Sequence, residues 1–227
     1  MTRRWTAAAF VLIAAVAVLP LSAAGELVDF PPGGYIHVDN SYGYLTVEGW
    51  DEPKVEVIAA NPPSVSGTPQ VAVKRLSDKE LAVTITPPAR RAFPLSILSY
   101  PPFHRTAAPE YTVHVPRDSR VAVHNDFGYV WVSDVAGDVE VDSHTGDMIV
   151  VLPEPGACSI DAKTGLGSIS SDLAGDGSKR LLVGSRFVHA GQAPTRRVFL
   201  RMGRGSITIK NGPPSGPFWK DDGLGNE

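Results

Sequence analysis

Glycines recur at nearly constant spacing through the second half of the chain and mark an internal repeat. They fall at positions 128, 137, 146, 156, 165, 175 and 184, so the steps between them are 9, 9, 10, 9, 10 and 9 residues. The segments between them alternate apolar and polar residues, as a strand does when one of its faces is buried. Because glycine adopts the backbone conformations of tight turns, the pattern predicts short strands separated by regular corners.

Three of these segments superimpose when they are counted back from Gly128, Gly146 and Gly165. The positions five and three residues before each glycine hold apolar or small residues, namely Val123, Val141, Ile160, Asn125, Ser143 and Ala162. The positions four and two residues before each glycine hold charged or ionisable residues, namely His124, Asp142, Asp161, Asp126, His144 and Lys163. One face of each strand is therefore predicted to point to a core and the other to solvent.

A repeat of 18 to 19 residues with two turns is typical of a solenoid coil, in which neighbouring coils stack to bury their apolar faces. The sequence therefore predicts an all-β fold, a parallel β-helix or β-solenoid-like single domain with short strands and glycine turns. An antiparallel β-sandwich also has short strands with turns every 8–12 residues and is the alternative.

The first strands belong to the same repeat. Residues 38–47 align with residues 123–132, with Val, Asn, Gly, Tyr and a final Val at equivalent positions. Further strands are predicted at 54–59, 71–76, 81–86, 111–115, 198–202 and 206–210, the second and third of them as a hairpin.

The chain divides into three predicted segments. Residues 1–24 have the basic start, short apolar stretch and small-residue cleavage site of a secretory signal peptide, with cleavage after Ala24. Residues 25–211 form the domain, interrupted by a proline-rich insertion at 87–109 that either packs on the flank or forms a partner-binding loop. Residues 212–227 form a tail. A secreted or periplasmic protein without a transmembrane segment in its mature chain is expected.

Composition excludes several classes of function. Removal of Arg3 and Arg4 with the signal peptide leaves 19 basic against 24 acidic residues, which disfavours nucleic-acid binding. The lone Cys158 is interpreted as a small buried hydrophobe. Zinc spacing, a calcium nonapeptide, a nucleotide loop and a catalytic Ser-His-Asp motif are absent from the sequence, so no cofactor is predicted.

Stacking in register would turn the outward residues into two ladders with rungs about 4.8 Å apart. One ladder would hold His124, Asp142 and Asp161, and the other Asp126, His144 and Lys163. A solvated surface with mild charge pairing is the first interpretation. A carbohydrate or metal site and acid–base catalysis are the alternatives.

Charge is segregated along the sequence. Residues 117–176 hold eleven acids and three bases, whereas residues 177–211 hold eight bases and no acid. If order in the sequence became position along a solenoid axis, the molecule would have a basic C-terminal end. Arg196, Arg197, Arg201 and Arg204 are then candidates for binding an anionic envelope glycan, a lipid headgroup or an acidic protein partner.

The segment YTVHVP followed by VAVHNDFGYVWVSDVAGDVEVDSHTGDMIV resembles the bacterial putative-adhesin domain of unknown function. The resemblance covers residues 34–211 and implies an extracytoplasmic, parallel β-helix-like fold without catalytic residues. We therefore expect a non-enzymatic, adhesin-like binding or scaffold protein of the bacterial cell envelope. A polysaccharide-acting enzyme on a β-helix scaffold is the alternative, because fold alone does not decide function.

Overall fold

A computed structural model describes residues 26–60, 69–86, 108–153, 158–179, 184–191 and 194–212. The predicted signal peptide, residues 87–107 of the proline-rich insertion and the tail after Gly212 lie outside the described residues. The boundaries assigned to these segments remain predictions.

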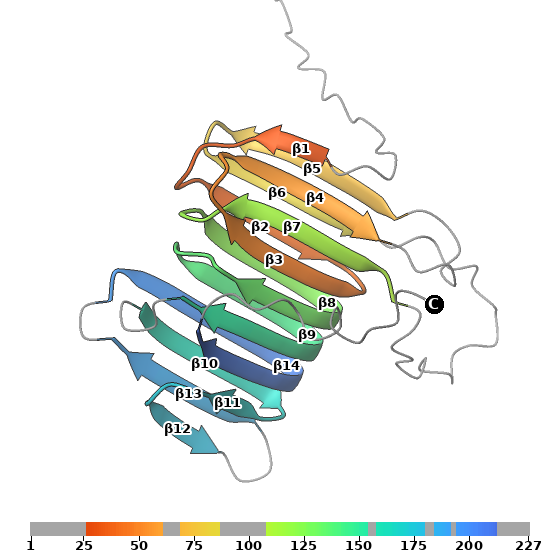
Figure 1. The fold of residues 1–227 in the computed structure, drawn as a ribbon. Coiled ribbons are helices and arrows are strands. Elements are labelled where there is room, and N and C mark those ends of the chain that lie inside the picture. Colours follow the sequence, from red (N-terminus) through yellow and green to blue (C-terminus); the bar gives the residue numbers. More distant parts are fainter. Residues whose placement is uncertain are drawn as a thin grey trace, which may run out of the picture.

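The described chain is all-β, as predicted, and its strands stack in the order seen in Figure 1. The strands are β1 (Glu26–Asp29), β2 (Tyr35–Asn40), β3 (Tyr44–Trp50), β4 (Lys54–Ala60), β5 (Gln70–Ser77), β6 (Glu80–Thr86), β7 (Glu110–Pro116), β8 (Arg120–Ser133), β9 (Val139–Leu152), β10 (Cys158–Leu166), β11 (Ile169–Ser171), β12 (Asp176–Lys179), β13 (Ser185–Ala190) and β14 (Arg196–Asn211). The strands predicted before residue 116 are confirmed by β4, β5, β6 and β7. The two predicted at 198–202 and 206–210 are one continuous strand, β14.

The strands form one mixed sheet that runs β1-β4-β7-β3-β8-β9-β14-β10-β13-β12, with β2, β5, β6 and β11 paired beside this path. The central pairs β2–β8, β3–β8, β8–β9, β9–β14 and β14–β10 are parallel. Antiparallel pairs lie at both ends, including the predicted β5–β6 hairpin. Parallel rungs thus build the middle of the molecule, and hairpins close its ends.

The long strands change partner at a central glycine. β8 pairs with β2 before Gly128 and with β3 after it, and β14 pairs with β10 before Gly205 and with β11 after it. Core residues before and after the glycine of β8 belong to one buried cluster, and they are Val121, Val123, Val130 and Val132. The two arms of each long strand therefore bury their inner faces in a shared core.

The predicted repeat register is confirmed for the first coils and wrong for the last. Val38, Val123 and Val141 are Cα partners across β2, β8 and β9. Ile160 instead pairs with Val198 of β14, a strand inserted between β9 and β10. The physical reason is length: β14 has 16 residues and pairs with β9 from Val139 to Leu152, whereas β10 has only nine. The longer strand satisfies more of the backbone groups of β9.

The corners of successive rungs form a glycine ladder, defined as Gly43, Gly128, Gly146, Gly205 and Gly167. All five have positive φ, between 121° and 144°. A Cβ on Gly146 would lie 1.8 Å from the carbonyl oxygen of Gly128, so a side chain at this corner would strike the backbone of the neighbouring rung. The sequence repeat located the corners at 128 and 146 correctly, but the third corner is Gly167 and not Gly165.

A buried polar ladder lies next to these corners on the inner face. The side-chain amide of Asn40 donates to Asn125 Oδ1 at 2.8 Å, and the Asn125 amide donates to Ser143 Oγ at 3.1 Å. All three residues are at most 2% exposed. These hydrogen bonds link β2, β8 and β9 in one register, since a shift by one residue would separate every pair.

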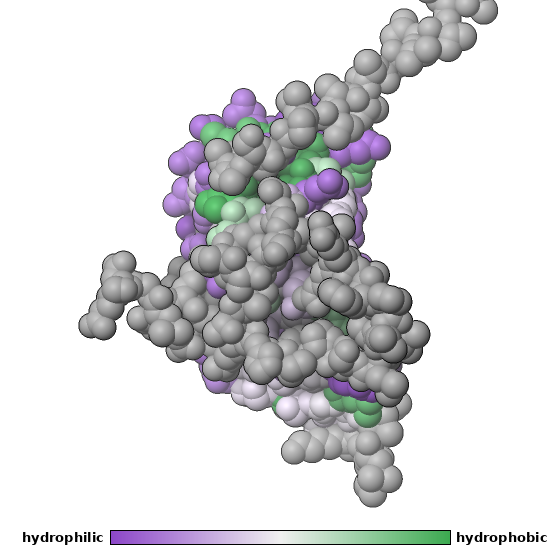
Figure 2. Space-filling model, turned by 90° about the vertical axis from the view of Figure 1, so that its right-hand side faces the viewer, coloured by the Kyte–Doolittle hydropathy of each residue, from purple (hydrophilic) through white to green (hydrophobic). Residues whose placement is uncertain are grey.

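Among the described strands, the outer strand β5 pairs only with β6, and it carries exposed charges at Lys74 and Arg75. Charged edge strands resist pairing with other chains. In Figure 2 hydrophilic and hydrophobic residues lie side by side at this upper end of the stack.

Candidate functional site

The first arms of the long strands β8, β9 and β14 pair side by side, with β2 and β10 next to them. The outward residues of these segments line up in rows that cross the strands. One row joins Asp39, His124, Asp142, Arg201, Lys163 and Arg186, which are successive Cα partners on β2, β8, β9, β14, β10 and β13. Its first members include carboxylates, and its last three members are all cations. We call Arg201, Lys163 and Arg186 the cation row.

The two ladders expected from the sequence are correct only in their first two rungs. His124 and Asp142 are Cα partners, but the next residue in that row is Arg201 and not Asp161. Lys163 is likewise separated from His144 because β14 lies between β9 and β10. His124 Nε2 lies 3.5 Å from Asp126 Oδ1, and His144 contacts the edge of Phe127 with ring centroids 6.0 Å apart.

Asp161 holds the two arginines of the cation row in place. Arg186 donates from Nε and Nη2 to its two carboxylate oxygens, at 3.3 and 3.1 Å. Arg201 donates from Nη1 to the Asp161 carbonyl oxygen at 2.8 Å, and its Nη2 lies 3.4 Å from the carboxylate. Lys163 stands between these arginines in the row and has no hydrogen bond or ion pair to any described residue. Two arginines therefore contact one carboxylate, and the lysine between them carries an unpaired charge among the described residues.

Burial on its own would raise the pKa of the Asp161 carboxyl, but the hydrogen bonds and charges of Arg186 and Arg201 outweigh it. The net result is a pKa below the usual value. Asp161 is thus an anion at neutral pH, and it orients the guanidinium groups around it.

The cation row lines a pocket of about 480 Å³ on the outer surface. Its other lining residues are small or short, and they are Asp161, Thr164, Gly165, Ser178, Gly184 and Ser185. A cavity of this size, with three cations and hydroxyl groups around one carboxylate, suits an anionic ligand group.

The four arginines expected to bind together are dispersed. Arg196 is 6% exposed and its guanidinium donates to the Val135 carbonyl oxygen at 2.6 Å, so it does not belong to an outer binding face. The reason is strand alternation, which points Arg196 inward and Arg197 outward. Arg204 is exposed near the glycine corner. Only Arg201 lies in the pocket with Asp161 and Lys163.

The charge segregation along the sequence does not translate directly into position along the stack. β14 carries Arg197, Arg201 and Arg204 but lies between β9 and β10, whose outward residues include Glu140, Asp142 and Asp161. Acidic residues of β9 and β10 therefore flank the arginines of β14, although the cation row gathers three bases on β14, β10 and β13. Sequence order and position along the stack differ because the last strand is inserted between earlier ones.

Cys158 is fully buried, which confirms its interpretation as a small core residue. Burial raises the pKa of its thiol, and the charge and hydrogen bond of Arg196 oppose that shift without cancelling it. The thiol therefore stays protonated near neutral pH and is a poor nucleophile.

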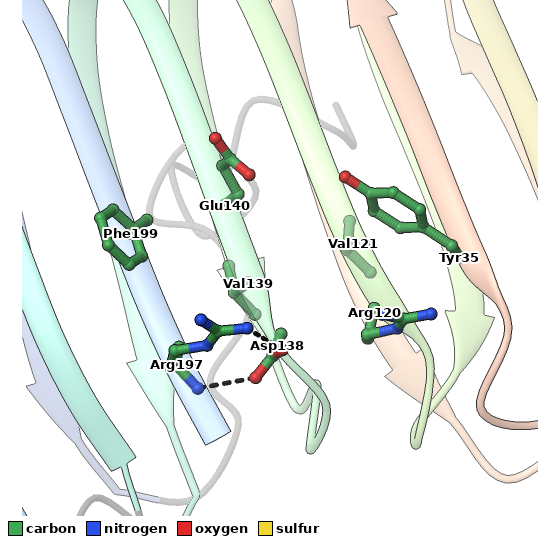
Figure 3. Close-up of a pocket in the computed structure, with 8 residues that line it drawn as sticks. All are labelled: Tyr35, Arg120, Val121, Asp138, Val139, Glu140, Arg197 and Phe199. Carbon is green, nitrogen blue, oxygen red and sulfur yellow. Dashed lines mark hydrogen bonds and ion pairs between the residues drawn. The ribbon is translucent and has the colours of Figure 1, made fainter.

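A second pocket, of about 290 Å³, lies on the same outer face across β2, β8, β9 and β14. Figure 3 shows Tyr35 and Phe199 at its two sides, with Glu140 between them. Arg197 donates its backbone N–H to Asp138 Oδ1 at 2.7 Å and its Nη2 lies 3.8 Å from the same carboxylate.

The sequence analysis did not single out Arg186, Phe199, Glu140 or Tyr35. They lie in one face only because strands distant in sequence pair with one another, and none stands at a repeat position that would mark it. The described residues gather no group of three or more His, Cys, Asp or Glu suited to a metal ion. The described residues also contain no helix with the length and apolar character needed to cross a membrane.

Comparison with known proteins gives distant structural neighbours only. No family model matches the chain, and no curated protein matches it. A putative cell adhesion protein from Clostridium sporogenes is similar over 86% of this chain and 100% of its own, with 14% identity and a TM-score of 0.47. A putative adhesin from Bacteroides fragilis is similar over 82% of this chain and 96% of its own, with 13% identity and a TM-score of 0.28. At these values neither neighbour bears on what the present chain binds.

Proposed function

We propose that this chain is a non-enzymatic, adhesin-like binding protein of the bacterial cell envelope that holds an anionic group in the pocket of the cation row. The observation that carries the proposal is that Arg201, Lys163 and Arg186, from three adjacent strands, line one pocket whose lining includes a single carboxylate, Asp161. Export by the predicted signal peptide and a solenoid-like stack of parallel rungs are parts of the same proposal.

The charge balance supports anion binding. Like charges on directly opposite strand positions destabilise a sheet, so a row of three cations is unfavourable without further anions. Asp161 compensates one charge and leaves two. An incoming carboxylate or phosphate would relieve that repulsion, and it would accept charge-assisted hydrogen bonds from arginines that Asp161 already orients.

The state of Asp161 also favours binding over the alternative of polysaccharide cleavage at this pocket. A general acid must hold its proton near neutral pH. The pKa of Asp161 lies below its usual value, so the carboxyl has no proton to donate there.

The test is the binding of the exported chain, residues 25–227, to immobilised polyphosphate and polygalacturonate while salt is varied. We expect binding that weakens as salt rises, because exposed charges are screened. Lys163→Ala and Arg186→Ala should each weaken binding about tenfold, the size expected for loss of a charge-assisted hydrogen bond.

The matched control is Lys74→Ala, which removes an exposed lysine from the edge strand β5, at the opposite end of the sheet. This variant should bind like the unsubstituted chain. Equal losses in the Lys74 and Lys163 variants, or binding that is indifferent to salt, would show that the pocket is not the binding site.

A further inference from the structure

An exposed aromatic side chain stands directly beside the cation row. Phe199 of β14 is 41% exposed, although large apolar residues are usually buried. Its Cα partners are Asp161 on β10 and Glu140 on β9. The Arg201 guanidinium carbon lies 5.2 Å from the centroid of its ring. Phe199 therefore sits at the boundary between the two outer pockets.

The pocket on the other side of Phe199 is amphipathic. Its walls are the rings of Tyr35 and Phe199, and its polar groups come from Arg120, Glu140, Asp138 and Arg197. Tyr35 is packed by the His37 ring at a centroid distance of 4.1 Å and by Arg120 at 5.4 Å, so its orientation is held. The side chain of Glu140 has no hydrogen bond or ion pair to any described residue.

The two pockets are neighbours on the sheet, with β14 contributing to both. The first is lined by residues of β2, β8, β9 and β14, and the second by residues of β14, β10, β13 and β12 together with the chain around Gly184. Phe199 belongs to the first pocket and Arg201, two residues along the same strand, to the second. Neighbouring strands are about 4.8 Å apart, a spacing comparable to the length of one hexose residue. An extended chain of sugars lying across the strands would place successive rings over successive strands.

We infer that the ligand is an acidic polysaccharide, with one sugar ring stacked on Phe199 and a carboxylate of the polymer in the cation row; the inference rests on the proposed function. A pyranose has an apolar C–H face and a rim of hydroxyls. The open ring of Phe199 matches the first, and the free carboxylate of Glu140 accepts hydrogen bonds from the second. The uronic-acid carboxylate matches the forked donors of Arg186 and Arg201 and the ammonium of Lys163.

The experiment compares two polymers that share charge and differ in rings. Polygalacturonate carries a carboxylate on each sugar, whereas polyphosphate carries charge and no ring. We expect Phe199→Ala to weaken binding of polygalacturonate about tenfold and to leave binding of polyphosphate unchanged. Glu140→Ala, which removes the hydrogen-bond acceptor, should also weaken only polygalacturonate, and Phe199→Trp should retain its binding, since an aromatic face is preserved.

Leu76→Ala is the matched control, because Leu76 is an apolar residue of β5 with 48% exposure. Thermal unfolding of each variant verifies that the fold is intact. Equal effects of Phe199→Ala on both polymers, no effect on either, or binding of polyphosphate alone would overturn the inference and leave the proposed function standing. Failure of both polymers to bind in a salt-dependent way would overturn the proposed function, and the inference with it.

Discussion

At the scale of single residues, the corners of the rungs tolerate only glycine. The glycine ladder has positive φ at every member, and each member lies against the carbonyl of the next rung. Any side chain at these positions would therefore be destabilising for two reasons. It would strain the backbone, and it would clash with a backbone atom of another strand.

Gly146→Ala tests this corner. The added Cβ would lie 1.8 Å from the Gly128 oxygen at φ 139°, so we expect the free energy of unfolding to fall by about 3 kcal/mol. Gly177→Ala is the control, because a Cβ there meets no atom within 4 Å. Urea denaturation of the two variants measures the difference, and similar midpoints would contradict the account of the corners.

Single residues also show where periodicity was informative. The spacing correctly located Gly128 and Gly146, because a turn repeated at each rung leaves a repeated residue. The charge segregation placed Arg196 in a binding surface, whereas strand alternation points it inward, where it donates to a backbone carbonyl. A count of charges does not reveal on which face each charge lies.

At the scale of elements, the buried Asn40–Asn125–Ser143 ladder specifies how β2, β8 and β9 align. Apolar side chains alone would tolerate a shift of two residues, since every second position is apolar. Buried amides do not, because a shifted register would leave them without partners in a low-dielectric core.

Asn125→Ala removes the acceptor of the Asn40 amide and the donor to Ser143 together. We expect a loss of about 2 kcal/mol in the free energy of unfolding. Combination with Asn40→Ala should cost less than the sum of the single changes, which a double-mutant cycle measures. Asn211→Ala, an exposed change at the end of β14, serves as the control. Additive costs would indicate that the two amides act independently.

At the scale of the whole molecule, the position of β14 makes the fold non-sequential. In a simple solenoid the last coil stacks on the end, and its loss leaves the other coils folded. Here the last strand contacts both β9 and β10 from the interior of the stack. The C-terminal and central parts of the chain therefore depend on each other for stability.

A chain that ends at Gly191 tests this dependence. Removal of β14 would expose the paired edge of β9 from Val139 to Leu152 and would detach β10 from it. We expect the shortened chain to lose its structure cooperatively and to aggregate through the unpaired strand edges. Circular dichroism and limited proteolysis measure this loss. A protease-resistant fragment that retains residues 26–152 would instead mean that the N-terminal rungs fold independently.

The sequence by itself determined that this chain is all-β, where most of the strands lie, that residues 38–47 and 123–132 occupy the same place in successive rungs, and that Cys158 is buried. These features are local or recur in register, so alternation and glycine spacing reveal them. Only the tertiary structure decided that β14 lies between β9 and β10, which brings Arg201 to Asp161 and Phe199 to Glu140. That choice depends on which strand best matches the full length of β9, a property of strand pairs that no single segment displays.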